Sequence, residues 1–186
     1  MEEEKLICGL GANQSPIDLR DYKIVVPNSF VPPNTYEIPR FVGVKNQGQV
    51  NSCVAHALAS TIEYFNMTQN RDLKSMSVGY IYGNRRNTEY KDKGMYVREA
   101  LAAILEDGDV SENDFVENVE VPECVELFDA RYEALKGKGV PHRISAYYTL
   151  KDKREMQYSL LYNGPVVFSI NWYSDMVVDE NGVLQS

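Results

Sequence analysis

Apolar residues recur at helical spacing in several stretches of the chain. From residue 52 to about 65 they form one continuous stripe, which predicts a buried helix of roughly three turns. A second stripe runs from 96 to 107 and stops at Gly108, a residue typical of a helix C-terminus. Two weaker patterns predict short helices, one from Pro122 to the glycines near 137 and one from 151 to 163.

Two other stretches have the composition of strands. Residues 143–150 are rich in β-branched and aromatic side chains, and residues 166–170 form a short apolar run that fits a buried strand. Asn181 and Gly182 are a pair typical of hairpin turns, so we expect a returning strand beyond them. Since few residues follow that turn, we expect an unfinished fold.

The first 40 residues contain five prolines, spaced so that no long helix fits between them. We therefore expect an extended N-terminal arm over residues 1–40. The rest of the chain, 41–186, is expected to form one globular domain, because 186 residues with 44% hydrophobic content suffice for one substantial core.

Charge and cysteine usage narrow the function classes. The chain has 19 Lys and Arg against 27 Asp and Glu, a formal net charge of −8, which repels phosphate backbones and anionic membranes. We expect neither nucleic acid nor membrane as a partner. The N-terminus is acidic where a secretory signal is basic, no stretch reaches membrane-spanning length, and three cysteines do not make a disulfide framework. These features favour a cytoplasmic protein.

Cys53 lies where a polar loop meets the first turn of the predicted helix at 52–65. There, unpaired backbone N–H groups and the positive end of the helix dipole face the sulfur, and such a setting favours the reactive thiolate. A buried structural cysteine is the alternative, since free cysteine is among the most buried residue types.

Gln47 lies six residues before Cys53. Its side-chain amide and the Cys53 backbone N–H are two donors for the oxyanion that forms when a thiolate attacks an amide carbonyl. Gly48 lets the loop turn tightly, so that Gln47 can fold back toward the sulfur. A solvated loop glutamine is the alternative.

Several segments in order along the chain resemble papain-like cysteine proteases. Residues 44–48, followed by Ser52-Cys53 and a helix of small residues, resemble the active-site segment of that family, and the Gln-to-Cys spacing matches. Four further segments resemble the family at the corresponding places. They are Asp18-Leu19-Arg20-Asp21, Met76 to Tyr82, Gly94 to Leu101, and Asn163 to Val167.

The resemblance implies an α+β fold, in which a helical subdomain packs against a β-rich subdomain that is incomplete here. A peptide or protein substrate would lie in the cleft between them. Cys53 would be the nucleophile of a hydrolase that cleaves peptide bonds through a thioester, Gln47 would stabilise the oxyanion, and Gly94 and Met95 would bind the substrate. We expect no cofactor, and the cysteines and histidines show no metal-ligand spacing.

One part of the family pattern is missing. The family places a catalytic histidine and then an asparagine on strands after the segment 163–167, and neither occurs before Ser186, which indicates a truncated sequence. His56 follows Cys53 on the same helix, where it lacks the cross-cleft geometry needed to protonate a leaving amine. His142 corresponds to a connector in the family.

Two other functions stay open. A peptide-binding protein that kept the cleft and lost the base is one, because fold does not guarantee activity. A cysteine-dependent acyltransferase such as a transglutaminase is the other, and transfer to an amine would distinguish it.

The arm is expected to be propeptide-like, with Cys8 as a thiol that could affect latency. Trp172 and Tyr173 would wall a pocket or pack in the core.

Overall fold

The computed structural model describes residues 11–19, 21–38, 43–70, 73–85, 93–171, 176–180 and 184–185. The helices are α1 (Cys53–Phe65), α2 (Val78–Gly83), α3 (Val97–Asp107), α4 (Glu123–Gly139) and α5 (Lys153–Tyr162), with a π-helical turn at Asn66–Asn70 and a 3₁₀ turn at Val140–His142. The strands are pairs of residues: β1 (Ala12–Asn13), β2 (Met95–Tyr96), β3 (Val177–Val178) and β4 (Leu184–Gln185). β1 pairs with β2 in parallel, and β3 pairs with β4 antiparallel.

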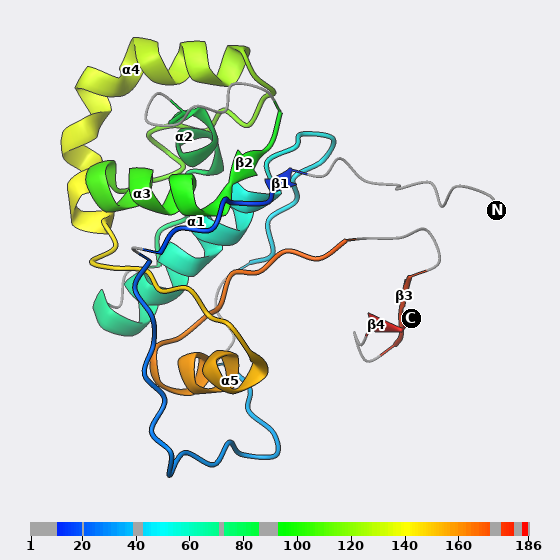
Figure 1. The fold of residues 1–186 in the computed structure, drawn as a ribbon. Coiled ribbons are helices and arrows are strands. Elements are labelled where there is room, and N and C mark those ends of the chain that lie inside the picture. The colour runs from blue at the N-terminus through cyan, green and yellow to red at the C-terminus, as the bar shows by residue number, and fades with distance from the viewer. Residues whose placement is uncertain are drawn as a thin grey trace.

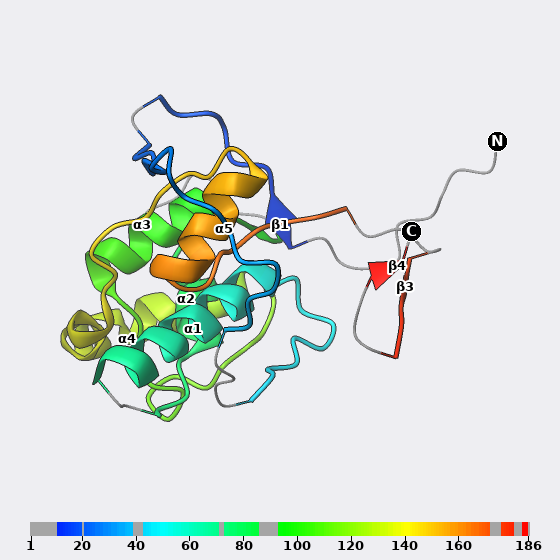
Figure 2. The same ribbon diagram turned by 90° about the horizontal axis from the view of Figure 1, so that it is seen from below.

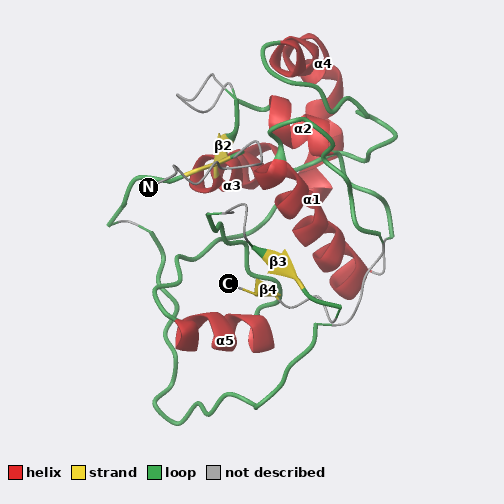
Figure 3. Ribbon diagram, turned by 90° about the vertical axis from the view of Figure 1, so that its right-hand side faces the viewer, coloured by secondary structure: helices red, strands yellow, loops and turns green. Residues whose placement is uncertain are grey.

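Helices α1 to α4 form one group, whereas α5 lies apart from them beside the N-terminal arm (Figures 1 and 3). β3 and β4 lie to the right of Figure 1, away from the helical group, and the view from below in Figure 2 agrees. No helix in the described part of the chain has both the length and the apolar content to cross a bilayer.

Alanines of α1 and α3 are buried in one apolar cluster. On α1 the buried face includes Ala55 and Ala59 rather than Ala57, which is exposed. On α3 it includes Ala100 rather than Leu105, which is 41% exposed. Small side chains allow two helix backbones to approach closely, so burial here follows the helix contact and not side-chain hydrophobicity alone. The two helices were predicted correctly and their buried faces only in part.

A second apolar cluster joins α2 to α4. The ring of Tyr80 lies 4.9 Å from that of Phe128 and 6.0 Å from that of Phe115, and all three side chains are fully buried. Leu135, two turns after Phe128, belongs to the same cluster. α4 runs for 17 residues, Glu123–Gly139, which confirms the helix predicted from Pro122 to the glycines near 137.

The two predicted strands are not formed as such. Residues 143–150 are irregular apart from one bridge between Lys23 and Thr149. Residues 166–170 have no strand assignment, and Phe168 is 66% exposed where a buried strand was expected. A strand needs a hydrogen-bonded neighbour, and no described segment pairs with 166–170. The returning strand after the predicted turn is present as β4, although the turn residues 181 and 182 lie outside the described part.

The N-terminal arm is extended, as expected, and crosses the helical group before it reaches α5 (Figure 1). The Asp21 carboxylate accepts hydrogen bonds from Arg98 Nε on α3 (2.9 Å) and from the Thr149 hydroxyl (3.0 Å). Arg98 Nη2 donates to the second oxygen of Asp21, so the pair is bidentate. This pairing fixes the middle of the arm to the helical group.

Further along, the arm packs on α5. Phe30 is only 7% exposed, and its ring lies 5.1 Å from the ring of Tyr158 and 6.2 Å from that of Tyr162. Arg154 places its guanidinium 5.5 Å from the Phe30 ring centroid and donates to the Pro27 carbonyl. α5 is therefore held largely through the arm.

Candidate active site

Cys53 is the first residue of α1, as predicted. The preceding Ser52 makes no side-chain cap on the helix, and its hydroxyl donates to Asn118 Oδ1 (3.0 Å). The first-turn N–H groups are thus not taken by a capping side chain. Backbone N–H groups of Val54, Gly11 and Cys53 itself interact with the thiol and favour its ionised form.

Burial nevertheless raises the pKa of the Cys53 thiol above its ordinary value, since the loss of solvation outweighs these backbone N–H groups. The expectation that the helix N-terminus alone favours the thiolate was therefore wrong. A half-buried thiolate of this kind needs a nearby positive charge as well, such as a protonated histidine.

Gln47 lies in a tight turn before α1. Its side-chain Nε2 donates to the Val50 carbonyl (3.0 Å), and the Val50 N–H donates to the Gln47 carbonyl (3.2 Å). Gly48 has a φ of 59°, which a residue with a Cβ rarely adopts, as the predicted turn requires. A side-chain amide has two N–H groups, and the bond to Val50 uses one of them. The turn thus holds the Gln47 side chain in the loop that leads to Cys53.

Gly94 and Met95 lie beside Gly11, but they differ in what their backbones contact. The Gly94 N–H donates to the Tyr82 hydroxyl (3.4 Å), and the Gly94 carbonyl accepts from Arg85 Nη2 (2.8 Å). The Met95 N–H donates to the Gly11 carbonyl (2.7 Å). Pairing with an extended segment therefore runs through Met95, and the Gly94 peptide groups contact side chains of the protein itself.

Gly11 in the arm links these two elements. A Cβ built on Gly11 would lie 2.8 Å from Cys53 Sγ, and one built on Gly94 would lie 2.8 Å from the Gly11 carbonyl oxygen. Both distances are shorter than real Cβ contacts. The arm thus lies directly over the sulfur and along the strand that the sequence predicted to bind substrate.

Neither histidine contacts Cys53 among the described interactions. His56 Nδ1 lies 2.9 Å from the Ser52 carbonyl, so it carries the proton and donates within the first turn of α1. His142 Nδ1 lies 3.3 Å from Asn66 Oδ1, just beyond the end of α1. A helix of 13 residues is about 20 Å long, which places His142 at the opposite end from Cys53. The structure therefore agrees with the reading of both histidines as non-catalytic.

Glu120 was not identified from the sequence. Its Oε1 accepts from both the backbone N–H and the side-chain Nδ2 of Asn51 (2.8 Å each), and its Oε2 accepts from the Tyr82 hydroxyl (2.8 Å). Burial and the Glu120 carboxylate raise the pKa of Tyr82 to about 12, so the phenol keeps its proton. No local motif pointed to Glu120, because Asn51 is 69 positions away in the chain.

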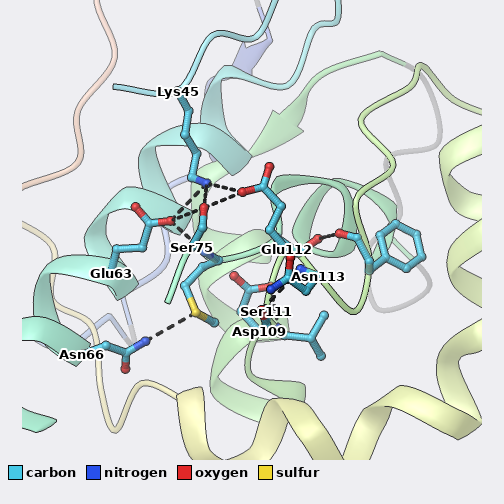
Figure 4. A network of polar contacts seen from close by, with 12 residues as sticks. Lys45, Glu63, Asn66, Ser75, Asp109, Ser111, Glu112 and Asn113 are labelled. Atoms are coloured by element: carbon cyan, nitrogen blue, oxygen red, sulfur yellow. Dashed lines mark hydrogen bonds and ion pairs between the residues drawn. The ribbon is translucent and has the colours of Figure 1, made fainter. Parts of the chain in front are cut away.

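A second group missed from the sequence holds the start of the Cys53 loop. Lys45 Nζ lies 3.1 Å from Glu63 of α1 and 3.3 Å from Glu112, with the Ser75 hydroxyl between them (Figure 4). Glu63 also accepts from the Met76 N–H (2.7 Å). The hydrogen bond from Ser75 and the charge of Lys45 lower the pKa of Glu112.

This network lines a pocket of about 270 Å³, together with His56 and Asn118. Cys53, Gln47 and Gly94 are not among the lining residues. The polar network is therefore a support for the loop and not part of the candidate active site.

The remaining predicted residues divide into two groups. Cys124 is fully buried, its thiol donates to the Gly79 carbonyl (3.3 Å), and burial raises its pKa to about 11. It is a structural cysteine. Cys8, Trp172 and Tyr173 lie outside the described residues.

A family model described as papain family cysteine protease matches residues 34–186. The chain is similar to the crystal structure of xylellain, a cysteine protease from Xylella fastidiosa, with 19% identity and a TM-score of 0.70, over 86% of this chain and 65% of xylellain. It is also similar to digestive procathepsin L 3 of the Tenebrio molitor larval midgut, with 20% identity and a TM-score of 0.49, over 66% of this chain and 38% of that one. No curated protein matches the chain.

The likeness to xylellain confirms the predicted α+β, papain-like fold, of which this chain has the helices and only short strands. The chain spans slightly less than two thirds of the length of xylellain. Since the family match covers well over half of its residues, the chain belongs to the papain family of cysteine proteases.

Proposed function

We propose that this chain carries the nucleophile of a cysteine peptidase that cleaves peptide or protein substrates. The Cys53 thiolate attacks the carbonyl carbon of a peptide bond, and a thioester forms as the amine departs with a proton. Water then cleaves the thioester, which releases the acid and restores the thiol. The observation that carries the proposal is the place of Cys53 at the first turn of α1, with backbone N–H groups around its sulfur.

The developing oxyanion would be stabilised by the Cys53 backbone N–H and by the Gln47 amide. The short turn that bonds Gln47 to Val50 supports this role, because it limits where the amide can move. Met95 would pair with the substrate backbone, as it pairs with the arm here. This use of Met95 follows the general rule that an extended peptide can add to an exposed strand edge.

The reaction also needs a base that faces Cys53 and is positively charged once it has taken the thiol proton. Burial raises the pKa of Cys53, and a positively charged partner would favour the thiolate against this effect. A histidine has this role in the family, whereas His56 and His142 face other groups. The proposed activity therefore belongs to a protein that has both this chain and such a histidine.

We further propose that the arm keeps the protein latent. The Gly11 carbonyl occupies the Met95 N–H, and the Gly11 backbone lies against Cys53 Sγ, so arm and substrate would compete for the same atoms. The ion pair between Asp21 and Arg98 would keep the arm in place. Activation would then require that the arm leave the strand.

A peptide-binding protein without catalysis is the second candidate. It is favoured by the same raised pKa of Cys53, which keeps the thiol neutral in this chain, and by the pairing of Met95 with an extended segment.

Hydrolysis of a fluorescently labelled, denatured protein at pH 7 by the full-length protein tests the two candidates. Peptidase activity predicts cleavage that is lost in Cys53→Ala and falls about 10²- to 10³-fold in Gln47→Ala, the usual cost of losing one oxyanion donor. Both variants should melt close to the parent temperature. Binding of a labelled peptide without any cleavage, equal in Cys53→Ala and parent, would favour the second candidate. Incorporation of a labelled amine in place of hydrolysis would show an acyltransferase.

A further inference from the structure

Glu120 contacts both sides of the candidate cleft at once. One carboxylate oxygen accepts two hydrogen bonds from Asn51, and the other accepts one from Tyr82, each at 2.8 Å. Asn51 and Tyr82 belong to different elements, the loop before α1 and helix α2. A single carboxylate thus connects two segments that are otherwise distant in sequence.

On one side, Asn51 sets the course of the loop that ends at Cys53. Both its backbone N–H and its side-chain amide are bound to Glu120, which fixes the peptide plane as well as the side chain. The Asn51 carbonyl oxygen is the atom closest to the position of a Cβ on Gly11, at 2.3 Å. Asn51 therefore forms part of the surface on which an extended segment lies beside the sulfur.

On the other side, Tyr82 contacts the segment Gly94–Met95 at the start of β2, which is called the Gly94–Met95 strand below. The Tyr82 hydroxyl accepts from the Gly94 N–H (3.4 Å) while it donates to Glu120. Arg85 stacks 3.8 Å from the Tyr82 ring centroid and donates to the Gly94 carbonyl (2.8 Å). The position of Gly94 thus depends on Glu120 through one hydroxyl group.

Attack on a bound peptide requires the sulfur and the target carbonyl to be about 3–3.5 Å apart, and an error of about 1 Å can reduce the rate by 10²-fold. The sulfur belongs to Cys53, and the substrate peptide would pair with the Gly94–Met95 strand. The chain from Asn51 through Glu120 and Tyr82 to Gly94 sets the distance between them.

We propose that Glu120 is a positioning residue, which fixes the spacing between the Cys53 loop and the Gly94–Met95 strand. It acts through Asn51 and Tyr82 and does not itself touch the reacting atoms. This inference rests on the proposed peptidase function for its catalytic meaning, whereas the coupling between the two segments can be measured without any activity.

Amide hydrogen exchange in the full-length protein tests the coupling, with Glu120→Gln and Tyr82→Phe as variants. Glutamine keeps the shape of Glu120 but presents an N–H₂ group where Oε2 accepts from Tyr82. We expect exchange at Gly94, which Glu120 does not contact, to rise about fivefold in Glu120→Gln, as expected for loss of one net hydrogen bond. Exchange at Asn51, which Tyr82 does not contact, should rise by a similar factor in Tyr82→Phe.

Glu117→Gln is the matched control, because Glu117 lies three residues earlier in the chain, forms an ion pair with Arg131, and its carboxylate makes no hydrogen bond to Asn51 or Tyr82 among the described contacts. It should leave exchange at Asn51 and Gly94 unchanged. The proposal would be overturned if Glu120→Gln changed exchange only at Asn51 and Tyr82→Phe only at Gly94. Equal changes in exchange in Glu117→Gln would also overturn it. This result does not depend on whether the protein cleaves peptides.

Inactivation kinetics then test the catalytic meaning. In a Cys8→Ser background, iodoacetamide reports the reactivity of the Cys53 thiol without any pairing to the strand, whereas a peptidyl chloromethyl ketone must also pair with the strand. We expect Glu120→Gln and Tyr82→Phe each to slow the peptidyl reagent about tenfold or more and iodoacetamide by less than about twofold, because only the peptidyl reagent needs the correct spacing. The double variant should resemble the single variants, since both break one path. Equal slowing of both reagents, or multiplied effects in the double variant, would show a merely structural role. If the parent protein neither cleaves peptides nor reacts with the peptidyl reagent, the proposed function is contradicted. The exchange data would still show whether Glu120 couples the Cys53 loop to the Gly94–Met95 strand.

Discussion

Gly11 lies so close to Cys53 that a Cβ on Gly11 would stand 2.8 Å from the cysteine Sγ and 2.3 Å from the Asn51 carbonyl oxygen. The Asn51 carbonyl oxygen is a backbone atom, which cannot move away by a rotamer change as a side chain can. Only glycine therefore fits at this point of the arm without a shift of the arm or of the loop before α1.

Gly11→Ala should lift the arm from Cys53, because the added methyl group meets the Asn51 backbone. An overpacked contact of this kind costs about 1–3 kcal/mol, so we expect iodoacetamide to alkylate Cys53 about tenfold faster. The rate is measured by mass spectrometry in a Cys8→Ser background, so that alkylation of Cys8 does not contribute to the signal. Gly137→Ala is the control, since no atom lies within 4 Å of its Cβ position and it sits in α4. It should leave the alkylation rate unchanged, and an unchanged rate in Gly11→Ala would mean that the arm does not shield the sulfur.

Alkylation of Cys53 should depend on pH as expected for a thiol whose pKa is raised. Burial favours the neutral thiol, so the rate in this chain should reach half of its maximum above about pH 8.5, the value of an exposed cysteine. The profile is measured from pH 6 to 10, with a small-molecule thiol as reference. A half-maximum well below that of the reference would show that a cation near Cys53 overcomes the effect of burial.

Arg98→Lys should weaken the hold on the arm. Lysine keeps the charge but loses the two parallel hydrogen bonds that Arg98 makes to Asp21, at a cost of about 1 kcal/mol for this partly exposed pair. We expect a lower urea midpoint together with faster Cys53 alkylation. Lys136→Arg, at the exposed pair with Glu133, is a control of similar chemistry and should change neither. A loss of stability without faster alkylation would mean that the ion pair does not determine where Gly11 lies.

Asp109→Asn should change how stability depends on pH. Asp109 is fully buried, and burial raises its pKa well above the ordinary value near 3.9. As pH rises above about 4, the unfolded chain loses this proton before the folded protein does, so Asp109 lowers the stability progressively toward its folded pKa. The free energy of unfolding of Asp109→Asn, minus that of the parent, should therefore increase from pH 4 to pH 7 in urea titrations. A constant difference would mean that the pKa of Asp109 is not raised.

Local patterns were sufficient for the helices and for the position of the nucleophile. Helical periodicity and the Gly108 stop predicted α1 and α3, and the loop-to-helix junction placed Cys53 at the start of α1. These features depend on residues within a few positions of one another. Which face of each helix is buried depends on its partner, and so Ala55 and Ala100 are buried whereas Ala57 and Leu105 are exposed.

The long-range contacts of the site had no such local pattern in the sequence. Glu120 and Lys45 act on residues tens of positions away, and although Lys45 lies in the segment 44–48, nothing near either residue in the sequence indicates its partners. The pKa of Cys53 was mispredicted for the same reason, because the arm that helps to bury the thiol comes from a segment more than 40 positions earlier. The strand at 166–170 failed because β-structure depends on a neighbouring strand as well as on composition.

The contact between Phe30 and α5 affects where this protein can be shortened. The family match begins at residue 34, which suggests a natural starting point for a minimal protein. Such a protein would lack Phe30 and would leave Tyr158 and Tyr162 with an uncovered aromatic surface. The segment recognised by sequence therefore begins after a residue that covers α5, and a shortened version of this chain should begin before Phe30.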